Sequence, residues 1–191
     1  AAELGPGAHA VHLDVTSQAS IDAAVKTVED KAGGIDILIN NAALFDLAPD
    51  AECGIEVDPR TASRERLQHL AALGFNRISF GVQDFDPDVQ QAVHRVQPFE
   101  QVEALMQAAR EIGFASINVD LIYGLPRQRP ENFARTIERV IAIAPDRIAL
   151  YGYAHLPERF KPQRRIVSAD LPDGGARLAM LAHAIAAFDR A

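Results

Sequence analysis

Residues 117–124 read INVDLIYG, and over the first five positions large apolar side chains alternate with polar ones. Successive side chains of a β-strand point to opposite faces of a sheet. A strand here would therefore place Ile117 and Val119 on one face and Asn118 and Asp120 on the other. The run is rich in Ile, Val and Leu and is short, which favours a strand over a helix. Comparable stretches are GIEVD (54–58), RISFGVQ (77–83) and RIALYGYA (147–154).

Strand-like and helical patterns alternate along the whole chain. HAVHLDV (9–15) and IDILINNA (35–42) complete a set of six candidate strands. Helical patterns cover residues 18–32, 61–73, 98–112 and 173–189, and another helix is expected to begin near Pro130. This alternation predicts a parallel sheet with right-handed crossovers. One interval is irregular, because the 11 residues between Ala42 and Gly54 include Pro49 and leave little room for a crossover helix.

The four later strands predict a sheet with two unlike faces. The face expected to pack against helices carries Ile55 and Val57; Ile78, Phe80 and Val82; Ile117, Val119, Leu121 and Tyr123; and Ala149, Tyr151 and Tyr153. The other face carries Gly54, Glu56 and Asp58; Ser79, Gly81 and Gln83; Asn118, Asp120 and Ile122; and Leu150, Gly152 and Ala154. A barrel without a ligand fills its interior with bulky branched side chains, and burial of an unpaired carboxylate is costly. The second face therefore predicts a wet or ligand-filled cavity.

Composition narrows the class of protein. The net charge of −7, without a long run of Lys or Arg, argues against a nucleic-acid or anionic-membrane surface. No apolar stretch approaches the roughly 20 residues of a membrane helix. The single cysteine, Cys53, excludes an internal disulfide and suits a reducing, cytoplasmic setting.

The first part of the chain carries the motifs HLDVT and GGIDILINNAAL. Residues 1–48 with these motifs resemble a middle βαβ unit of the short-chain dehydrogenase/reductase family. That family also needs a glycine-rich turn between a strand and a helix, and GPGAHA (5–10) precedes a strand instead. Its Tyr-x-x-x-Lys pair is absent from the chain. We therefore do not expect NAD(P)-dependent dehydrogenase activity.

The remaining residues carry longer motifs in a consistent order: IEVDPR (55–60), GFNRISFGVQDFD (74–86), VQQAVHRVQ (89–97), REIGFASINVDLIYGLPRQ (110–128) and PDRIALYGYAHLP (145–157). From about residue 53 to residue 191 the chain resembles the oxygen-independent coproporphyrinogen III oxidases of the radical S-adenosylmethionine superfamily. The resemblance implies S-adenosylmethionine as a cofactor, with a second cofactor molecule beside the first. The contacts that it implies are Glu56, Gln83, Arg95, Asp120, Ile122 and Ala154. It assigns no catalytic residue and no metal ligand to this chain.

The resemblance also implies a [4Fe–4S] cluster, which that superfamily holds on three thiolates spaced Cys-x-x-x-Cys-x-x-Cys. One cysteine cannot provide this set of ligands. We therefore expect these residues to keep the wall that faces the cofactor but not the electron donor.

Together these observations predict an α/β fold of parallel βα repeats. The expected form is a partial, about six-stranded radical-SAM-type barrel whose first strands are replaced by a Rossmann-type βαβ unit. Residues 1–48 would form that unit, residues 49–53 a junction, and residues 54–191 the partial barrel.

The leading hypothesis for function is a fragment or chimera derived mainly from a coproporphyrinogen III oxidase, an enzyme of oxidative decarboxylation in porphyrin and haem biosynthesis. We expect it to be inactive by itself. The expected partners are a small-molecule cofactor or a porphyrinogen, and neither nucleic acid nor a membrane; the oligomeric state is left open. The alternatives are a non-catalytic α/β scaffold and, third, a short-chain dehydrogenase.

Overall fold

The computed structural model describes residues 11–13, 17–32 and 50–191. The chain divides into two compact units, residues 1–47 and 48–191. In the first unit, α1 spans Gln18–Ala32, as the sequence predicts. Ser17 caps this helix, because its Oγ accepts a hydrogen bond from the backbone N–H of Ser20 at 3.3 Å. The strand expected at 35–42 lies outside the described residues, as does most of the one at 9–15; residues 11–13 form no strand.

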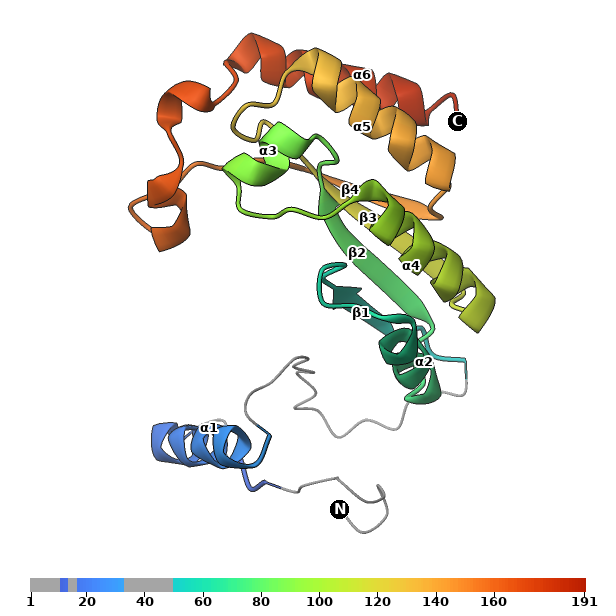
Figure 1. Ribbon diagram of the computed structural model, residues 1–191, viewed down its shortest axis with the longest axis vertical. Helices are drawn as coiled ribbons and strands as arrows, with labels where there is room; N and C mark the ends of the chain where they lie inside the picture. The colour runs from blue at the N-terminus through green and yellow to red at the C-terminus, as the bar shows by residue number, and fades with distance from the viewer. Residues whose placement is uncertain (1–10, 14–16, 33–49) are drawn as a thin grey trace. The chain divides into compact units, whose positions relative to one another are not determined.

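The second unit is built on a sheet of four parallel strands in the order β1-β2-β3-β4 (Figure 1). The strands are β1 (Gly54–Val57), β2 (Arg77–Gln83), β3 (Ser116–Tyr123) and β4 (Arg147–Gly152). The α-helices are α2 (Arg64–Ala72), α3 (Pro87–Ala92), α4 (Phe99–Ile112), α5 (Pro130–Ile143) and α6 (Gly174–Phe188). Two short 3-10 helices, η1 (Lys161–Arg165) and η2 (Ser168–Asp170), lie between β4 and α6. The parallel α/β prediction is confirmed.

Local sequence signals set the ends of these helices. The Ser63 Oγ accepts a hydrogen bond from the backbone N–H of Arg66 at the start of α2, and Asp173 does the same for Ala176 at the start of α6. Gly113 ends α4 with φ of 101°, a left-handed conformation that favours glycine. Pro130 occupies the first turn of α5, where its missing N–H is not needed.

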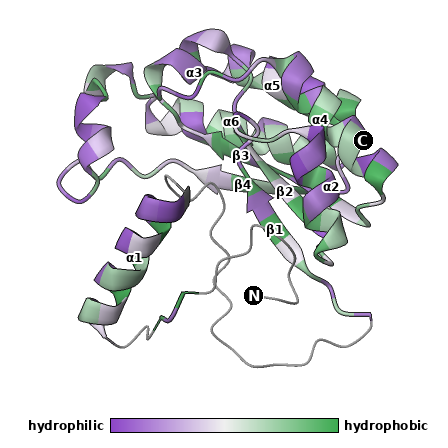
Figure 2. Ribbon diagram, turned by 60° about the horizontal axis from the view of Figure 1, so that its bottom comes forward, coloured by the Kyte–Doolittle hydropathy of each residue, from purple (hydrophilic) through white to green (hydrophobic). Residues whose placement is uncertain are grey.

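The hydrophobic core lies on one face of the sheet. Phe80, Val119 and Leu121 are fully buried there, in one cluster with apolar side chains of α2, α4, α5 and α6. In Figure 2 these helices lie together on one side of the strands. The large hydrophobic area removed from water is the main stabilising term of this unit. The opposite face is left to the polar side chains of the strands.

The predicted facing of β4 is wrong by one residue. Asp120 is paired with Ala149, and Ile122 with Tyr151, so Ala149 and Tyr151 share the polar face. Leu150, predicted for the polar face, packs against the core together with Ile148. The error has a physical cause: the run RIALYG has apolar residues at both parities, so its alternation does not identify the buried face.

Candidate functional site

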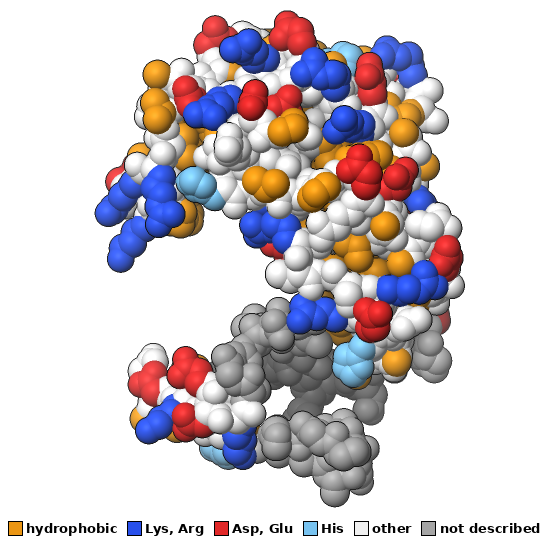
Figure 3. All heavy atoms as spheres, in the orientation of Figure 1, with side chains coloured by type: hydrophobic (Ala, Val, Ile, Leu, Met, Phe, Trp, Pro, Cys, Tyr) orange, Lys and Arg blue, Asp and Glu red, His pale blue; other side chains and the backbone are white. Residues whose placement is uncertain are grey.

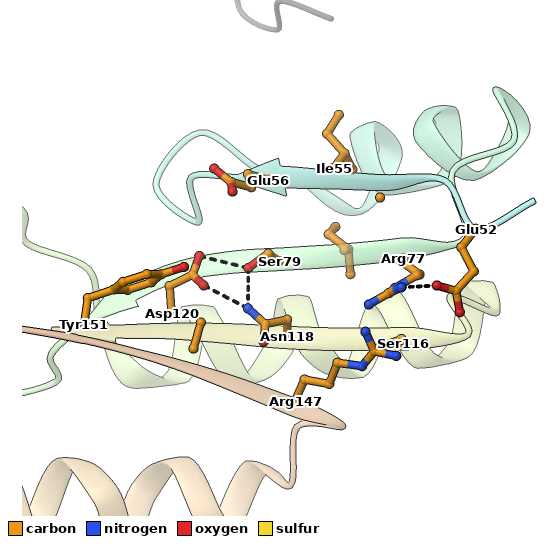
Figure 4. Close-up of a pocket in the computed structure, with 13 residues that line it drawn as sticks. Glu52, Ile55, Glu56, Arg77, Ser79, Ser116, Asn118, Asp120, Arg147 and Tyr151 are labelled. Carbon is orange, nitrogen blue, oxygen red and sulfur yellow. Dashed lines mark hydrogen bonds and ion pairs between the residues drawn. The ribbon is translucent and has the colours of Figure 1, made fainter. Parts of the chain in front are cut away.

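The polar face of the sheet carries an open cavity of about 460 Å³ (Figure 4). Its lining comes from all four strands and from Glu52, just before β1. The lining residues are Glu52, Gly54, Ile55, Glu56, Arg77, Ile78, Ser79, Ser116, Asn118, Asp120, Arg147, Ala149 and Tyr151. We call it the sheet cavity.

A hydrogen-bonded group of three side chains stands in the sheet cavity. Asn118 Nδ2 donates to Ser79 Oγ at 2.7 Å and to Asp120 Oδ1 at 2.8 Å. Ser79 Oγ in turn donates to Asp120 Oδ2 at 2.9 Å. Figure 4 shows the three side chains pointing toward one another. Each carboxylate oxygen of Asp120 is thus fixed by a neighbour and keeps lone-pair capacity for a ligand donor.

Glu56 lines the same cavity from β1. It is exposed, and its carboxylate has no hydrogen bond or ion pair with any residue that the structure describes. Glu56 is paired in register with Ser79, and Ser79 with Asn118, so the three lie in one row across the sheet. Two carboxylates, Glu56 and Asp120, therefore face one cavity, an arrangement that suits hydroxyl or ammonium donors.

A second cavity, of about 390 Å³, lies beyond the ends of β2 and β3. We call it the loop cavity. Its lining residues are Gln83, Ala92, Val93, His94, Arg95, Ile122, Leu125, Tyr153, Pro162, Gln163, Arg165 and Ile166. Asp120 and Ile122 are alternate residues of β3 and face the same side, so the two cavities follow one another along this strand.

The six predicted cofactor contacts are divided between these cavities. Glu56 and Asp120 line the sheet cavity, whereas Gln83, Arg95 and Ile122 line the loop cavity. Ala154 lines neither; it is exposed after β4, and its carbonyl oxygen accepts a hydrogen bond from Gln163 Nε2 at 3.0 Å.

The Arg95 side chain is fixed by two acceptors. Its Nη2 donates to the carbonyl oxygen of Gly81 at 2.8 Å, and its Nη1 lies 3.4 Å from Oδ2 of Asp58. Partial burial lowers the pKa of Arg95 from its ordinary value. A hydrogen bond from Arg60 lowers the pKa of Asp58, so both groups of the pair are charged at neutral pH.

Gln83 has an unusual backbone conformation. Its φ is 67°, in the left-handed region that residues other than glycine rarely adopt. The register between β2 and β3 shifts between Gly81 and Gln83, which is a bulge at the end of β2. Bulges of this kind redirect a side chain and are common next to active sites. Here the bulge turns Gln83 into the loop cavity.

A buried polar network behind the loop cavity escaped the sequence analysis. Its members are the five buried polar side chains of the described residues, Asp84, Gln90, Gln97, Gln128 and Thr136. Thr136 Oγ1 donates to Asp84 Oδ1 at 2.7 Å, and Gln128 Nε2 donates to Asp84 Oδ2. Burial raises the pKa of the Asp84 carboxyl. The Gln90 side chain spans the turn that carries Arg95: its Nε2 donates to the carbonyl oxygen of Gln97 at 2.9 Å, and its Oε1 accepts from the backbone N–H of Gln97 at 3.0 Å.

This network joins the loops after β2 and β3. Gln128 Oε1 accepts from the backbone N–H of Leu125 at 3.1 Å, and Gln128 Nε2 donates to the carbonyl oxygen of Ile122 at 2.9 Å. Because the same side chain holds Asp84, the two loops have a fixed spacing. The network therefore sets the shape of the loop cavity.

Comparison with known proteins identifies the family. A sequence model described as the radical SAM superfamily matches residues 14–140. The chain belongs to the radical SAM superfamily. The match includes α1 and begins within the stretch that resembles a short-chain dehydrogenase.

Two similar relatives of this radical SAM chain carry the same name. The oxygen-independent coproporphyrinogen III oxidase of Pseudomonas aeruginosa is 56% identical over 128 residues, which are 67% of this chain and 28% of the relative. The one of Escherichia coli is 53% identical over 142 residues, 74% of this chain and 31% of the relative. A solved structure of coproporphyrinogen III oxidase from Escherichia coli matches with a TM-score of 0.75 and 45% identity, covering 91% of this chain and 37% of that chain. The chain thus spans about a third of the length of these relatives.

No group of three or more His, Cys, Asp or Glu side chains within the described residues is arranged to hold a metal ion. None of the helices described is long and apolar enough to cross a membrane.

Proposed function

We propose that the polar face of the sheet binds S-adenosylmethionine, and that the chain supplies this part of an oxygen-independent coproporphyrinogen III oxidase. The observation that carries the proposal is the fixed carboxylate of Asp120 in the sheet cavity, held by Ser79 and Asn118. The identity to oxidases of that name supports the assignment of the family reaction. That reaction is the oxidative decarboxylation of two propionate side chains of a porphyrinogen to vinyl groups.

The side chains of both cavities fit the donors and acceptors of this cofactor. Glu56 and Asp120 provide carboxylates for the ribose hydroxyls or the ammonium group. Arg95 provides a planar guanidinium that can pair with the carboxylate of the methionyl group. Gln83 adds an amide with both donor and acceptor capacity.

Two further residues complete the proposed set of contacts. Ile122 gives an apolar surface between the two cavities, and Ala154, at the end of the same sheet, is proposed as a contact of a second cofactor molecule.

The donor set of this chain does not fit the [4Fe–4S] cluster of the superfamily. Three thiolates are required, and Cys53 is the one cysteine of the sequence. We infer that these 191 residues do not hold the cluster by themselves and therefore do not turn over. Anaerobic reconstitution with iron and sulfide should give no stoichiometric cluster; a stable cluster with turnover would contradict this.

The origin of residues 1–48 is a separate proposal. In it, residues 1–48 are a short-chain-dehydrogenase-like βαβ unit that joins residues 54–191 through a junction at 49–53, which gives the partial, about six-stranded barrel. The helix at 18–32 and the compact unit 1–47 agree with it. The radical SAM match from residue 14 favours instead one continuous family unit.

Deletion of residues 1–49 distinguishes these origins. If residues 1–48 are an independent unit, residues 50–191 alone should have the same thermal unfolding midpoint as in the full chain. A continuous family unit predicts a fall in that midpoint, because strands of the same sheet would be lost.

Isothermal titration calorimetry of the folded chain with S-adenosylmethionine tests the proposed function. Saturable binding is expected, and NADH under the same conditions should give none. A cooperatively folded sample that binds no S-adenosylmethionine would favour the non-catalytic scaffold, and saturable NADH binding would favour the dehydrogenase.

A further inference from the structure

The segment between β4 and α6 is rich in basic side chains. Residues 156–170 contain four of them, Arg159, Lys161, Arg164 and Arg165, against the acids Glu158 and Asp170, in a chain whose net charge is −7. Figure 3 shows Lys and Arg side chains gathered on this projecting segment. A local excess of positive charge on an acidic protein indicates an anionic ligand.

Arg165 lies at the end of η1, where two cavities meet. It lines the loop cavity and also a neighbouring cavity of about 280 Å³, whose other lining residues are Gln91, Ala92, His94, Pro126, Arg127, Ile166, Val167 and Asp170. Both cavities share Ala92, His94, Arg165 and Ile166. The Arg165 side chain therefore stands on the boundary between two hollows that together can hold a ligand larger than either.

The charge of Arg165 is not compensated within the described part of the chain, where its side chain has no hydrogen bond or ion pair. Two basic neighbours, Arg127 and Arg164, do have side-chain partners. Arg127 Nε lies 3.1 Å from Oδ2 of Asp170, and Arg164 Nε donates to the carbonyl oxygen of Pro157 at 2.9 Å. The lining of the loop cavity contains Arg95 and Arg165 and no Asp or Glu. Arg95 is paired with Asp58, whereas Arg165 has no acid beside it in this lining, which favours a bound carboxylate at Arg165.

The remaining wall of the loop cavity is mainly apolar. Val93, Ile122, Leu125, Tyr153 and Ile166 contribute to it. An apolar wall with a few placed polar groups is typical of a small-molecule site. The ligand that fits such a lining has an apolar ring body and carboxylates at its edge.

Hydrogen bonds hold the segment that carries Arg165 against the rest of the unit. The backbone N–H of Arg127 donates to the carbonyl oxygen of Asp170 at 2.7 Å. Within the segment, Gln163 Oε1 accepts from the backbone N–H of Leu156 at 2.5 Å. The guanidinium is therefore presented from a fixed backbone, which reduces the entropy lost when it binds a ligand.

We infer that Arg165 binds a carboxylate of the substrate, a propionate group of the porphyrinogen ring, at the boundary between the loop cavity and the neighbouring cavity. This inference rests on the proposed function for the identity of the ring. It separates the roles of the two arginines: Arg95 pairs with the carboxylate of the cofactor, and Arg165 with a carboxylate of the substrate.

The test uses fluorescence titrations of the full chain with three probes. Coproporphyrin III is the stable, oxidised form of the proposed substrate ring. 1-Pyrenebutyrate has an apolar body with one carboxylate, and 1-pyrenebutanol is its neutral counterpart. The variants are Arg165→Gln, Arg165→Lys and Arg159→Gln, the last being a control because Arg159 lines neither cavity.

Arg165→Gln should weaken the binding of coproporphyrin III and 1-pyrenebutyrate by about tenfold, the loss of one charge-assisted pair. Arg165→Lys should recover part of this loss. Arg165→Gln should leave the affinity for 1-pyrenebutanol unchanged, and Arg159→Gln should leave the affinity for all three probes unchanged. Equal affinity of wild type and Arg165→Gln for both carboxylate probes overturns the inference, as does a folded wild type that binds neither of these two probes.

The outcomes separate this inference from the proposed function. If coproporphyrin III binds to wild type and Arg165→Gln with equal affinity, the proposed function is still supported but Arg165 does not bind the substrate. If 1-pyrenebutyrate depends on Arg165 while neither S-adenosylmethionine nor coproporphyrin III binds, a carboxylate site at Arg165 is supported and the proposed function is wrong.

Discussion

The carbonyl oxygen of Gly81 accepts a hydrogen bond of 2.8 Å from Nη2 of Arg95. A Cβ atom at position 81 would lie 2.9 Å from that same nitrogen and 3.0 Å from Nε2 of Gln83. The absence of a side chain at Gly81 therefore lets two proposed cofactor contacts approach the sheet. The first prediction follows from this close approach.

Gly81→Ala should displace Arg95 and Gln83, because both are flexible at their ends and the new methyl group takes their place. We expect S-adenosylmethionine to bind at least about fivefold more weakly, as one charge-assisted hydrogen bond is disturbed. Calorimetric titration measures this. Gly174→Ala is the matched control, since a Cβ there meets nothing within 4 Å. An affinity equal to that of Gly174→Ala would show that Arg95 does not depend on Gly81.

Thr136→Val should destabilise the second unit. The substitution removes the Oγ1 that donates to Asp84 at 2.7 Å and accepts from the backbone N–H of Phe85 at 3.2 Å. The change leaves the buried N–H of Phe85 unpaired and removes one of the two donors to Asp84 Oδ1, the other being the backbone N–H of Asp86. The free energy of unfolding should fall by about 2 kcal/mol. Urea unfolding measures the change, with Thr27→Val in α1 as the control, because Thr27 is only half-buried and its Oγ1 donates to the carbonyl oxygen of Ala23 in the same helix. A loss no larger than that of the control would contradict the account of the network.

The Asp58 carboxyl predicts a pH dependence. The hydrogen bond from Arg60 lowers its pKa below the ordinary value of 3.8 in the folded chain. The stabilisation is therefore fully present above 3.8 and is lost as the pH falls through the lower, folded-state value. Because the pair is partly exposed, the effect should stay below about 1 kcal/mol.

Unfolding of wild type and Asp58→Asn between pH 5 and 3 measures this contribution. The difference between the two proteins should shrink toward the acid end of the range. A difference that does not change with pH would exclude Asp58 as the source.

The facing of β4 predicts unequal effects of two adjacent substitutions. Leu150 packs against the core, whereas Tyr151 is 56% exposed and lines the sheet cavity. Leu150→Ala should lower the free energy of unfolding by about 2 kcal/mol, and Tyr151→Ala by less than about 1 kcal/mol. Denaturant unfolding of both variants measures the two losses. A larger loss for Tyr151→Ala than for Leu150→Ala would support the facing predicted from the sequence.

The sequence was sufficient for β2 and β3 because their apolar and polar residues alternate. The same criterion failed for β4, where Ile148, Ala149 and Leu150 are all apolar and the facing depends on the neighbouring strand. The helices were predictable from their caps and glycines, such as Ser63 and Gly113.

The candidate site was only partly predictable. Glu56 on β1 and Asp120 on β3 lie on one face of the sheet and were found by alternation. The network around Asp84 was missed, because Asp84 and Gln128 lie 44 residues apart in loops where polar residues are ordinary. Their burial depends on the way the loops after β2 and β3 fold over each other, which no local pattern contains. The role of Arg165 likewise depends on a cavity formed by three separate segments.

The most direct test of the proposed cofactor site is the affinity of Asp120→Ala for S-adenosylmethionine, measured by calorimetry on a sample whose thermal unfolding is cooperative. Asp88→Ala is the control, because Asp88 is an exposed acid of α3 that lines neither the sheet cavity nor the loop cavity. The account predicts that Asp120→Ala binds at least about tenfold more weakly than wild type, whereas Asp88→Ala binds equally well. Undiminished binding by a folded Asp120→Ala variant would contradict it.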